Sequence, residues 1–198
     1  MRKRVDASIV PDGLAAPPAK PFAHPCLLKG ANTTVDGVLL TGTSDFDACL
    51  KLHSSLAHSC DDRHDDCHPL NKIPPPKTGG KFLAFSYFYD VLTEFLPDDD
   101  TPTVAEIRAA ARRVCSSSFA EIHALHAATY DPLEPEHLLR ACQDLTYIVE
   151  LLHHYLGFAE DEERIQLVKQ VRGKEMSWTL GASLRMLNAA SKPANAEL

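Results

Sequence analysis

The stretch from Lys81 to Leu96, KFLAFSYFYDVLTEFL, contains the side chains best suited to binding a ligand. Residues 82–87 alternate in the manner of a β-strand, and from Phe88 onward the apolar residues recur at helical spacing. The joint, Tyr87-Phe88-Tyr89-Asp90, is therefore expected at the carboxyl end of a strand, where α/β proteins bind their ligands. Its polar-tipped side chains suit a site that stacks on a planar ring and hydrogen-bonds the ring edge. A buried strand end whose tyrosine hydroxyls are satisfied locally is the alternative interpretation.

A second cluster of chemically active side chains, CDDRHDDCH, runs from Cys60 to His68. Aspartate, histidine and cysteine at short spacing are typical metal ligands, but their order here matches no known zinc spacing. Cys60 and Cys67 can instead close a small loop through a disulfide. We therefore expect no metal site in this chain.

The elements that position these residues follow from hydrophobic periodicity and helix caps. Ser44 is expected to cap one helix, and the capping box from Thr103 to Glu106 opens another. The longest helix carries Asp144 and Tyr147 at i, i+3, so the two side chains face in one direction. The pattern predicts helices over residues 45–59, 88–96, 103–115, 118–128, 136–155 and 178–187, strands over residues 36–40, 82–87 and 165–171, and loops over the proline-rich residues 11–25 and 69–80.

Composition places the chain among ordinary globular proteins. Its 198 residues are 44% hydrophobic and 24% charged, enough for a core of one domain. A net charge of −7 argues against nucleic acid as a partner, because phosphate binding needs clustered lysine and arginine. No apolar run approaches the roughly 20 residues that cross a bilayer, so we expect no membrane segment.

Cysteine usage and one sequon indicate the compartment. Six cysteines form an even set, and Asn32-Thr33-Thr34 is a glycosylation sequon that we expect on a loop. Together they favour an oxidising compartment, either the lumen of the secretory pathway (Golgi or endoplasmic reticulum) or the extracellular space. The basic start MRKR is not followed by the apolar region of a signal peptide. We therefore expect the chain to be the carboxyl-terminal portion of a longer secreted protein.

Three stretches in order carry a family resemblance: FSYFYD at residues 85–90, CQDLTYIVELL at 142–152 and EMSWTLGASLRML at 175–187. They resemble the apyrase, or nucleoside triphosphate diphosphohydrolase, family, and within it most closely the Golgi guanosine diphosphatases. The resemblance covers nearly the whole chain. It implies an α/β fold, namely the C-terminal lobe of an actin-like (ribonuclease H-like) two-lobe fold, with a mixed sheet, packed helices and disulfides.

The same resemblance implies a set of residues around the nucleotide base. They are Tyr87, Asp90, His137, Asp144, Tyr147 and Trp178. Structural roles are the alternative for each: Trp178 can pack at a domain interface, Asp144 can be solvated and Tyr147 can belong to the core. Ala141 stands where some cell-surface relatives place a stacking aromatic, so base recognition must differ from theirs.

The sequence lacks parts of the family pattern, and these differences determine which activity we expect. Neither glycine-rich phosphate loop is present, and no counterpart of the glutamate base is visible. We therefore expect the base-binding lobe of a nucleoside diphosphatase that depends on Ca²⁺ or Mg²⁺, inactive alone and completed by an amino-terminal lobe. No catalytic residue is assigned. The alternative is a stand-alone secreted domain that binds nucleotides or proteins without catalysis.

Domain limits and disulfides complete the expectations. We expect a partial helix and proline-rich linker over residues 1–25, the lobe over 26–190 and a flexible tail over 191–198. Family members have disulfides around these motifs. The resemblance therefore implies bridges between cysteines that are neighbours in the sequence. Of the 15 connectivities that six cysteines allow, we predict Cys26–Cys49, Cys60–Cys67 and Cys115–Cys142.

Overall fold

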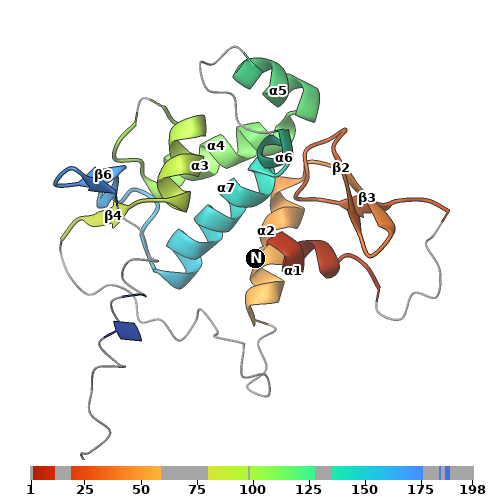
Figure 1. Ribbon diagram of the computed structural model, residues 1–198, viewed down its shortest axis with the longest axis horizontal. Helices are drawn as coiled ribbons and strands as arrows, with labels where there is room; N and C mark the ends of the chain where they lie inside the picture. The colour runs from red at the N-terminus through yellow and green to blue at the C-terminus, as the bar shows by residue number, and fades with distance from the viewer. Residues whose placement is uncertain are drawn as a thin grey trace, which may run out of the picture.

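The computed structural model describes residues 2–11, 19–58, 80–97, 99–127 and 135–175, together with Ser183, Met186 and Leu187. Helix α7 lies at the centre, between α4 on one side and α2 on the other (Figure 1). The helices are α1 Arg2–Ala7, α2 Phe46–His58, α3 Tyr87–Phe95, α4 Val104–Ser116, α5 Phe119–Ala127, α6 Pro135–Leu138 and α7 Ala141–Glu150, followed by the π-helix η2 Leu151–Tyr155. The strands are β1 Phe22–His24, β2 Asn32–Val35, β3 Val38–Gly42, β4 Phe82–Ala84, β5 Ile165–Leu167, β6 Gln170–Val171 and β7 Lys174–Glu175.

The mixed α/β architecture is confirmed, but the described strands form three small sheets rather than one. In the first sheet β3 is central, parallel to β1 and antiparallel to β2. Strands β4 and β5 form a parallel pair, and β6 and β7 form an antiparallel hairpin. The expectation of a loop throughout residues 11–25 is therefore wrong for β1. It failed because three residues between prolines give too short a pattern to read.

The β2–β3 hairpin also corrects the sequence prediction. Asn32 was expected on a loop but starts β2, where it is exposed and its Oδ1 accepts a hydrogen bond of 2.8 Å from Thr41 Oγ1. Asp36 and Gly37 turn the chain with φ of 49° and 80°, so the strand predicted to begin at Asp36 begins at Val38. Two successive left-handed residues are the geometry of a two-residue hairpin turn.

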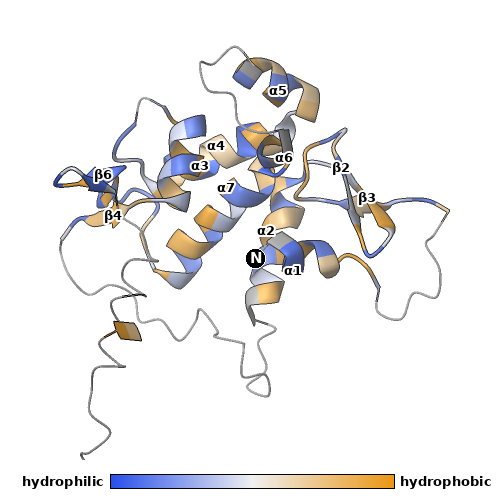
Figure 2. Ribbon diagram, in the orientation of Figure 1, coloured by the Kyte–Doolittle hydropathy of each residue, from blue (hydrophilic) through white to orange (hydrophobic). Residues whose placement is uncertain are grey.

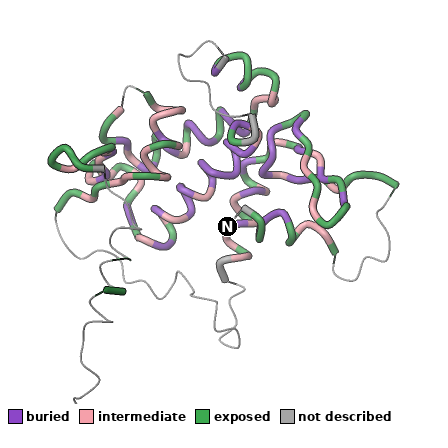
Figure 3. Tube along the Cα trace, viewed as in Figure 1, coloured by how far each residue is buried: buried purple, intermediate pink, exposed green. Residues whose placement is uncertain are grey.

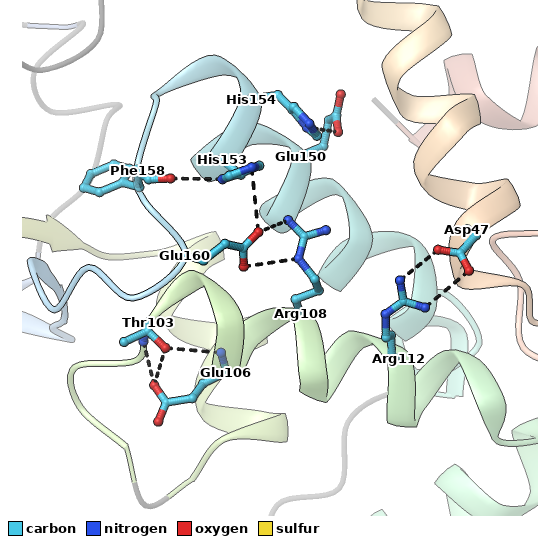
Figure 4. Close-up of polar contacts among 10 residues, drawn as sticks. All are labelled: Asp47, Thr103, Glu106, Arg108, Arg112, Glu150, His153, His154, Phe158 and Glu160. Carbon is cyan, nitrogen blue, oxygen red and sulfur yellow. Dashed lines mark hydrogen bonds and ion pairs between the residues drawn. The ribbon is translucent and has the colours of Figure 1, made fainter.

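The first residues of α2 and α4 test the helix caps that the sequence predicted. Asp45, rather than Ser44, caps α2, because its Oδ1 accepts from the Ala48 backbone N–H at 2.9 Å. Ser44 instead accepts from the Lys29 backbone N–H. The capping box of α4 is confirmed, with Thr103 and Glu106 exchanging side-chain and backbone hydrogen bonds (Figure 4).

The long helix predicted over residues 136–155 is divided into α6, α7 and η2. At the first break the Leu139 carbonyl accepts from the Leu28 backbone N–H at 3.2 Å instead of continuing a helical ladder. Arg140 then leaves helical geometry, with φ −101° and ψ 4°. A tertiary hydrogen bond and a turned residue thus end α6, which no periodicity could indicate. The predicted strand over 165–171 is likewise divided, into β5 and β6.

The core surrounds α7, which is buried along almost its whole length (Figure 3). Apolar residues of α2 and α7 belong to this core, and both helices carry hydrophobic positions, coloured orange in Figure 2. Two predicted disulfides are confirmed: Cys26–Cys49 joins the segment after β1 to α2, and Cys115–Cys142 joins α4 to α7. The predicted Cys60–Cys67 bridge lies outside the described residues.

The N-terminal helix is attached to this core by a buried ion pair. Asp6, 4% exposed, accepts two hydrogen bonds from the Arg140 guanidinium, at 2.9 and 2.7 Å. His24 Nε2 lies 3.0 Å from the same carboxylate. Burial acts to raise the pKa of Asp6, but the hydrogen bonds and charges of His24 and Arg140 outweigh it, so the pKa lies below its ordinary value.

Replacing Asp6 by alanine should lower the free energy of unfolding by roughly 3–5 kcal/mol, because Arg140 would stay buried without its carboxylate. Urea denaturation at neutral pH measures the change. Asp47→Ala is the matched control, since Asp47 and its partner Arg112 are more than half exposed (Figure 4) and such pairs contribute less than about 1 kcal/mol. Equal effects of the two substitutions would contradict the anchoring role of Asp6.

Candidate functional site

A cleft of about 390 Å³ opens where β4 runs into α3, facing the junction of α6 and α7. Helix α3 and the residue before it supply most of the wall, and α6 and α7 supply the rest. The lining residues are Ser86, Tyr87, Asp90, Val91, Phe95, His137, Ala141 and Asp144. The cleft thus combines an aromatic and apolar wall with two carboxylates and one imidazole, which suits a flat ligand with polar edges.

The joint between β4 and α3 is tighter than the sequence indicates. Strand β4 ends at Ala84 rather than Tyr87, and Ser86 adopts φ 53° and ψ −125° before α3 begins. A side chain in this region of backbone space costs about 1–3 kcal/mol, and such residues cluster at binding sites. The turn at Ser86 sets Tyr87 and Asp90 in the first turn of α3, where both line the cleft.

Tyr87 and Asp144 form the polar contact at the wall of the cleft. The Tyr87 hydroxyl donates to Asp144 Oδ1 at 3.1 Å, and Asp144 is 4% exposed. Asp90 and His137 are exposed, so they lie at the mouth of the cleft. The cleft therefore has one fixed, buried carboxylate and one solvated carboxylate.

The structure brings together four of the six predicted base-site residues, Tyr87, Asp90, His137 and Asp144. Tyr147 lies behind the wall, with its ring centroid 6.4 Å from that of Tyr87. Burial raises the pKa of the Tyr147 hydroxyl, as expected for a side chain that is part of the packing. Trp178 lies outside the described residues.

Sequence reasoning did not assign Ser86, Val91 and Phe95 to the site. Val91 and Phe95 follow Tyr87 at i+4 and i+8, so the helical stripe contained the signal that they share its face. Ser86 carried no signal, because it lies between the strand pattern and the helical stripe, where its positive φ turns the chain. The edge of Phe95 also packs against His126, with centroids 5.2 Å apart.

His126 of α5 is a buried contact behind the cleft wall. It is only 7% exposed and forms an ion pair with Glu94 of α3. This contact fastens α5 to the end of α3 that carries Phe95. The cleft wall is therefore supported from behind by a second helix.

The described residues do not form a site for Ca²⁺ or Mg²⁺, the ions that the resemblance implies. These ions prefer several oxygen ligands. Among the described residues, the one group of three candidate ligands is Cys26, Cys49 and His53, whose donors are sulfur and nitrogen. No step of a reaction is therefore assigned to a metal in this part of the chain.

Comparison with known proteins identifies the family of the chain. A model of the GDA1/CD39 (nucleoside phosphatase) family matches residues 12–197. The chain therefore belongs to the GDA1/CD39 (nucleoside phosphatase) family, and the apyrase resemblance is confirmed at this level.

Individual relatives are similar over part of the chain. Ectonucleoside triphosphate diphosphohydrolase 5 of Gallus gallus is 34% identical over 120 residues, which cover 59% of this chain and 25% of that protein. Ectonucleoside triphosphate diphosphohydrolase 8 of Homo sapiens is 26% identical over 192 residues, 85% of this chain and 37% of that protein. Probable apyrase 4 of Arabidopsis thaliana is 29% identical over 124 residues, 62% and 23% respectively. The chain thus spans 23–37% of the length of these curated relatives.

Within the described residues, no helix is long and apolar enough to cross a membrane.

Behind Tyr147 lies a buried histidine that makes stability depend on pH. The ring of His53 is 1% exposed and its centroid lies 5.6 Å from that of Tyr147. Burial lowers the pKa of His53 to about 4, against about 6.5 in an unfolded chain. At pH values between these two pKa values, the unfolded state binds a proton that the folded state does not bind. The free energy of unfolding therefore falls as pH falls.

We expect this histidine to remove up to roughly 3 kcal/mol of stability as pH is lowered from about 6.5 to about 4. His53→Leu should abolish that part of the pH dependence in urea unfolding curves. His123→Leu, which changes an exposed histidine of α5, should preserve it. A His53→Leu protein with the same slope as the unmodified chain would refute the assignment.

Proposed function

We propose that this chain is the nucleotide-base-binding lobe of a divalent-metal-dependent nucleoside di- or triphosphate diphosphohydrolase. The observation that carries the proposal is the cleft beside α3, which two aromatic rings and two carboxylates line. Family membership supports nucleoside phosphates as the ligand class. The finer assignment, to the Golgi guanosine diphosphatase-like members and an actin-like two-lobe fold with a lobe over residues 26–190, is part of the same proposal.

The cleft residues have distinct roles in this proposal. Tyr87 offers its ring face to the base, and Tyr147 supports Tyr87 from behind. Asp90 and Asp144 accept hydrogen bonds from the base edge, while His137 lies at the mouth. Trp178 of the closing segment is proposed to approach from the other side. Ala141 leaves room at the wall where a stacking residue would otherwise stand.

Carboxylate acceptors favour guanine among the bases. A carboxylate only accepts hydrogen bonds, and guanine donates from both N1 and N2, whereas N1 of adenine accepts. A buried group left unpaired costs about 1–3 kcal/mol, which is tenfold or more in affinity. Asp144 is the more buried of the two carboxylates, and Asp90 is the more accessible.

The hydrolysis itself requires parts that the sequence does not contain. Phosphoanhydride cleavage depends on preorganised donors around the phosphates and on a positioned water. We propose that an amino-terminal lobe of the same enzyme supplies the phosphate loops, the general base and the Ca²⁺ or Mg²⁺ site. The disulfides favour the secretory pathway lumen or the extracellular space as the compartment.

A binding domain without catalysis is the second candidate. The same cleft could bind a nucleotide, or a protein side chain, in a secreted protein that performs no hydrolysis. The two candidates differ in one measurement: only the first gains phosphatase activity when the amino-terminal lobe is added.

The isolated chain should release no phosphate from GDP, UDP or ATP at an enzyme-like rate with Mg²⁺ or Ca²⁺, because the phosphate-binding loops are absent. Malachite green detection of phosphate provides the measurement, and adding the amino-terminal lobe should restore activity. Turnover of several molecules per second by the pure chain would overturn the partial-enzyme proposal. Lack of activity in the two-lobe protein would favour the binding domain.

Base selectivity tests the carboxylates in the two-lobe enzyme. Asp90→Ala and Asp144→Asn should each reduce the ratio of kcat/KM for GDP over ADP by about tenfold, with a smaller effect on kcat, since they remove acceptors for the base edge. Asp161→Ala is the control, because this exposed aspartate does not line the cleft. An unchanged ratio in both cleft variants would remove the base-reading role.

A further inference from the structure

Cys26, Cys49 and His53 form a buried cluster that the proposed function does not use. Their sulfur and nitrogen atoms lie within 4.8 Å of one another, and all three residues are buried. Cys49 and His53 are four residues apart on α2, so their side chains share one face of the helix. Cys26 comes from the segment after β1 and is joined to Cys49 by the disulfide. None of the three lines the cleft beside α3.

The state of His53 points to a ligand. Neither ring nitrogen makes a hydrogen bond of normal geometry with a described residue, although the side chain is 1% exposed, and its contact with the Gln143 backbone falls outside that geometry. A neutral imidazole with an available lone pair is the form that binds metal ions. Buried polar groups normally have partners, so an unpartnered imidazole beside two sulfur atoms needs an explanation.

We propose that reduction of the Cys26–Cys49 disulfide converts this cluster into a zinc site, with Cys26, Cys49 and His53 as ligands and water in the fourth position. A dithiol supplies two electrons and two protons, which turn the disulfide into two thiols, and the dithiol itself becomes a disulfide. Zn²⁺ then displaces both thiol protons into solvent and forms two Zn–S bonds and one Zn–N bond.

The donor set and the spacing both suit zinc. Two thiolates and an imidazole are ligands for Zn²⁺ and not for Ca²⁺ or Mg²⁺. Bond lengths of about 2.3 Å to sulfur and 2.0–2.1 Å to nitrogen, at tetrahedral angles, separate the donor atoms by roughly 3.5–3.8 Å. In the structure the three donor atoms lie within 4.8 Å of one another, and the two sulfur atoms must move apart from their bonded distance once the disulfide is opened. The bound ion would keep the segment after β1 attached to α2 while the disulfide is open.

The test uses the full chain carrying Cys60→Ser and Cys67→Ser, which removes the thiols of the other cysteine cluster. The chain is reduced with a dithiol, desalted without oxygen and titrated with Zn²⁺ in competition with a chromogenic chelator. We expect tight binding of zinc by the reduced chain and none by the oxidised chain. His53→Leu should weaken binding at least about 100-fold, and His123→Leu should leave it unchanged.

X-ray absorption at the zinc edge gives a result that does not depend on any His53 variant folding. The reduced chain should show two sulfur neighbours at about 2.3 Å and an imidazole nitrogen at 2.0–2.1 Å. The Cys115–Cys142 pair is an internal control, since it belongs to no such three-ligand group among the described residues. Sulfur ligands without imidazole, equal affinity in His53→Leu, or equal affinity of the oxidised chain would each overturn the proposal.

Discussion

Helix α7 is buried on nearly every side although it carries four buried polar or charged side chains, and each of the four makes at least one hydrogen bond. Buried polar groups cost stability unless they are hydrogen-bonded, so α7 can sit at the centre only where partners meet it. The partners are Arg140 for Gln143, Tyr87 for Asp144, the Cys142 carbonyl for Thr146 and His154 for Glu150. Three of these contacts reach neighbouring segments, namely the α6–α7 junction, the start of α3 and η2, whereas the Thr146 bond lies within α7. The cleft is formed between two of the segments that these contacts hold.

The packing of α7 therefore determines the geometry of the cleft. Asp144 is held by Tyr87, which α3 presents because the chain turns sharply at Ser86. His137 and Ala141 lie on either side of the break between α6 and α7, and Arg140 sits within that break. A rigid wall of this kind is what lets a few polar atoms discriminate between ligands of similar size, because the wall does not move to accommodate the wrong one.

Local signals in the sequence predicted much of the fold, and tertiary contacts account for what was missed. The α4 capping box and the helix over α5 were readable because their determinants lie within a few residues. Asp36-Gly37 was an equally clear signal for a hairpin turn, but the predicted strand wrongly included these two residues. The break at Arg140 was not readable, since it depends on Leu28 and Asp6 far away in the chain. For the cleft, the strand–helix pattern, the helical spacing and the family resemblance together indicated Tyr87, Asp90, His137 and Asp144. The burial of His126 and His53 depends on elements that periodicity cannot place.

The ion pair between Asp6 and Arg140 also affects the order in which segments can fold during synthesis. The two residues are 134 positions apart, whereas the described disulfides close separations of only 23 and 27. At about 5–20 residues per second, a ribosome needs roughly 7–27 s to add the chain between them. During that interval helix α1 has no guanidinium to dock against, and six residues are too few to form a stable helix alone. Helix α1 can therefore dock only after the central helix α7 has been synthesised, although it precedes α7 by more than 130 residues.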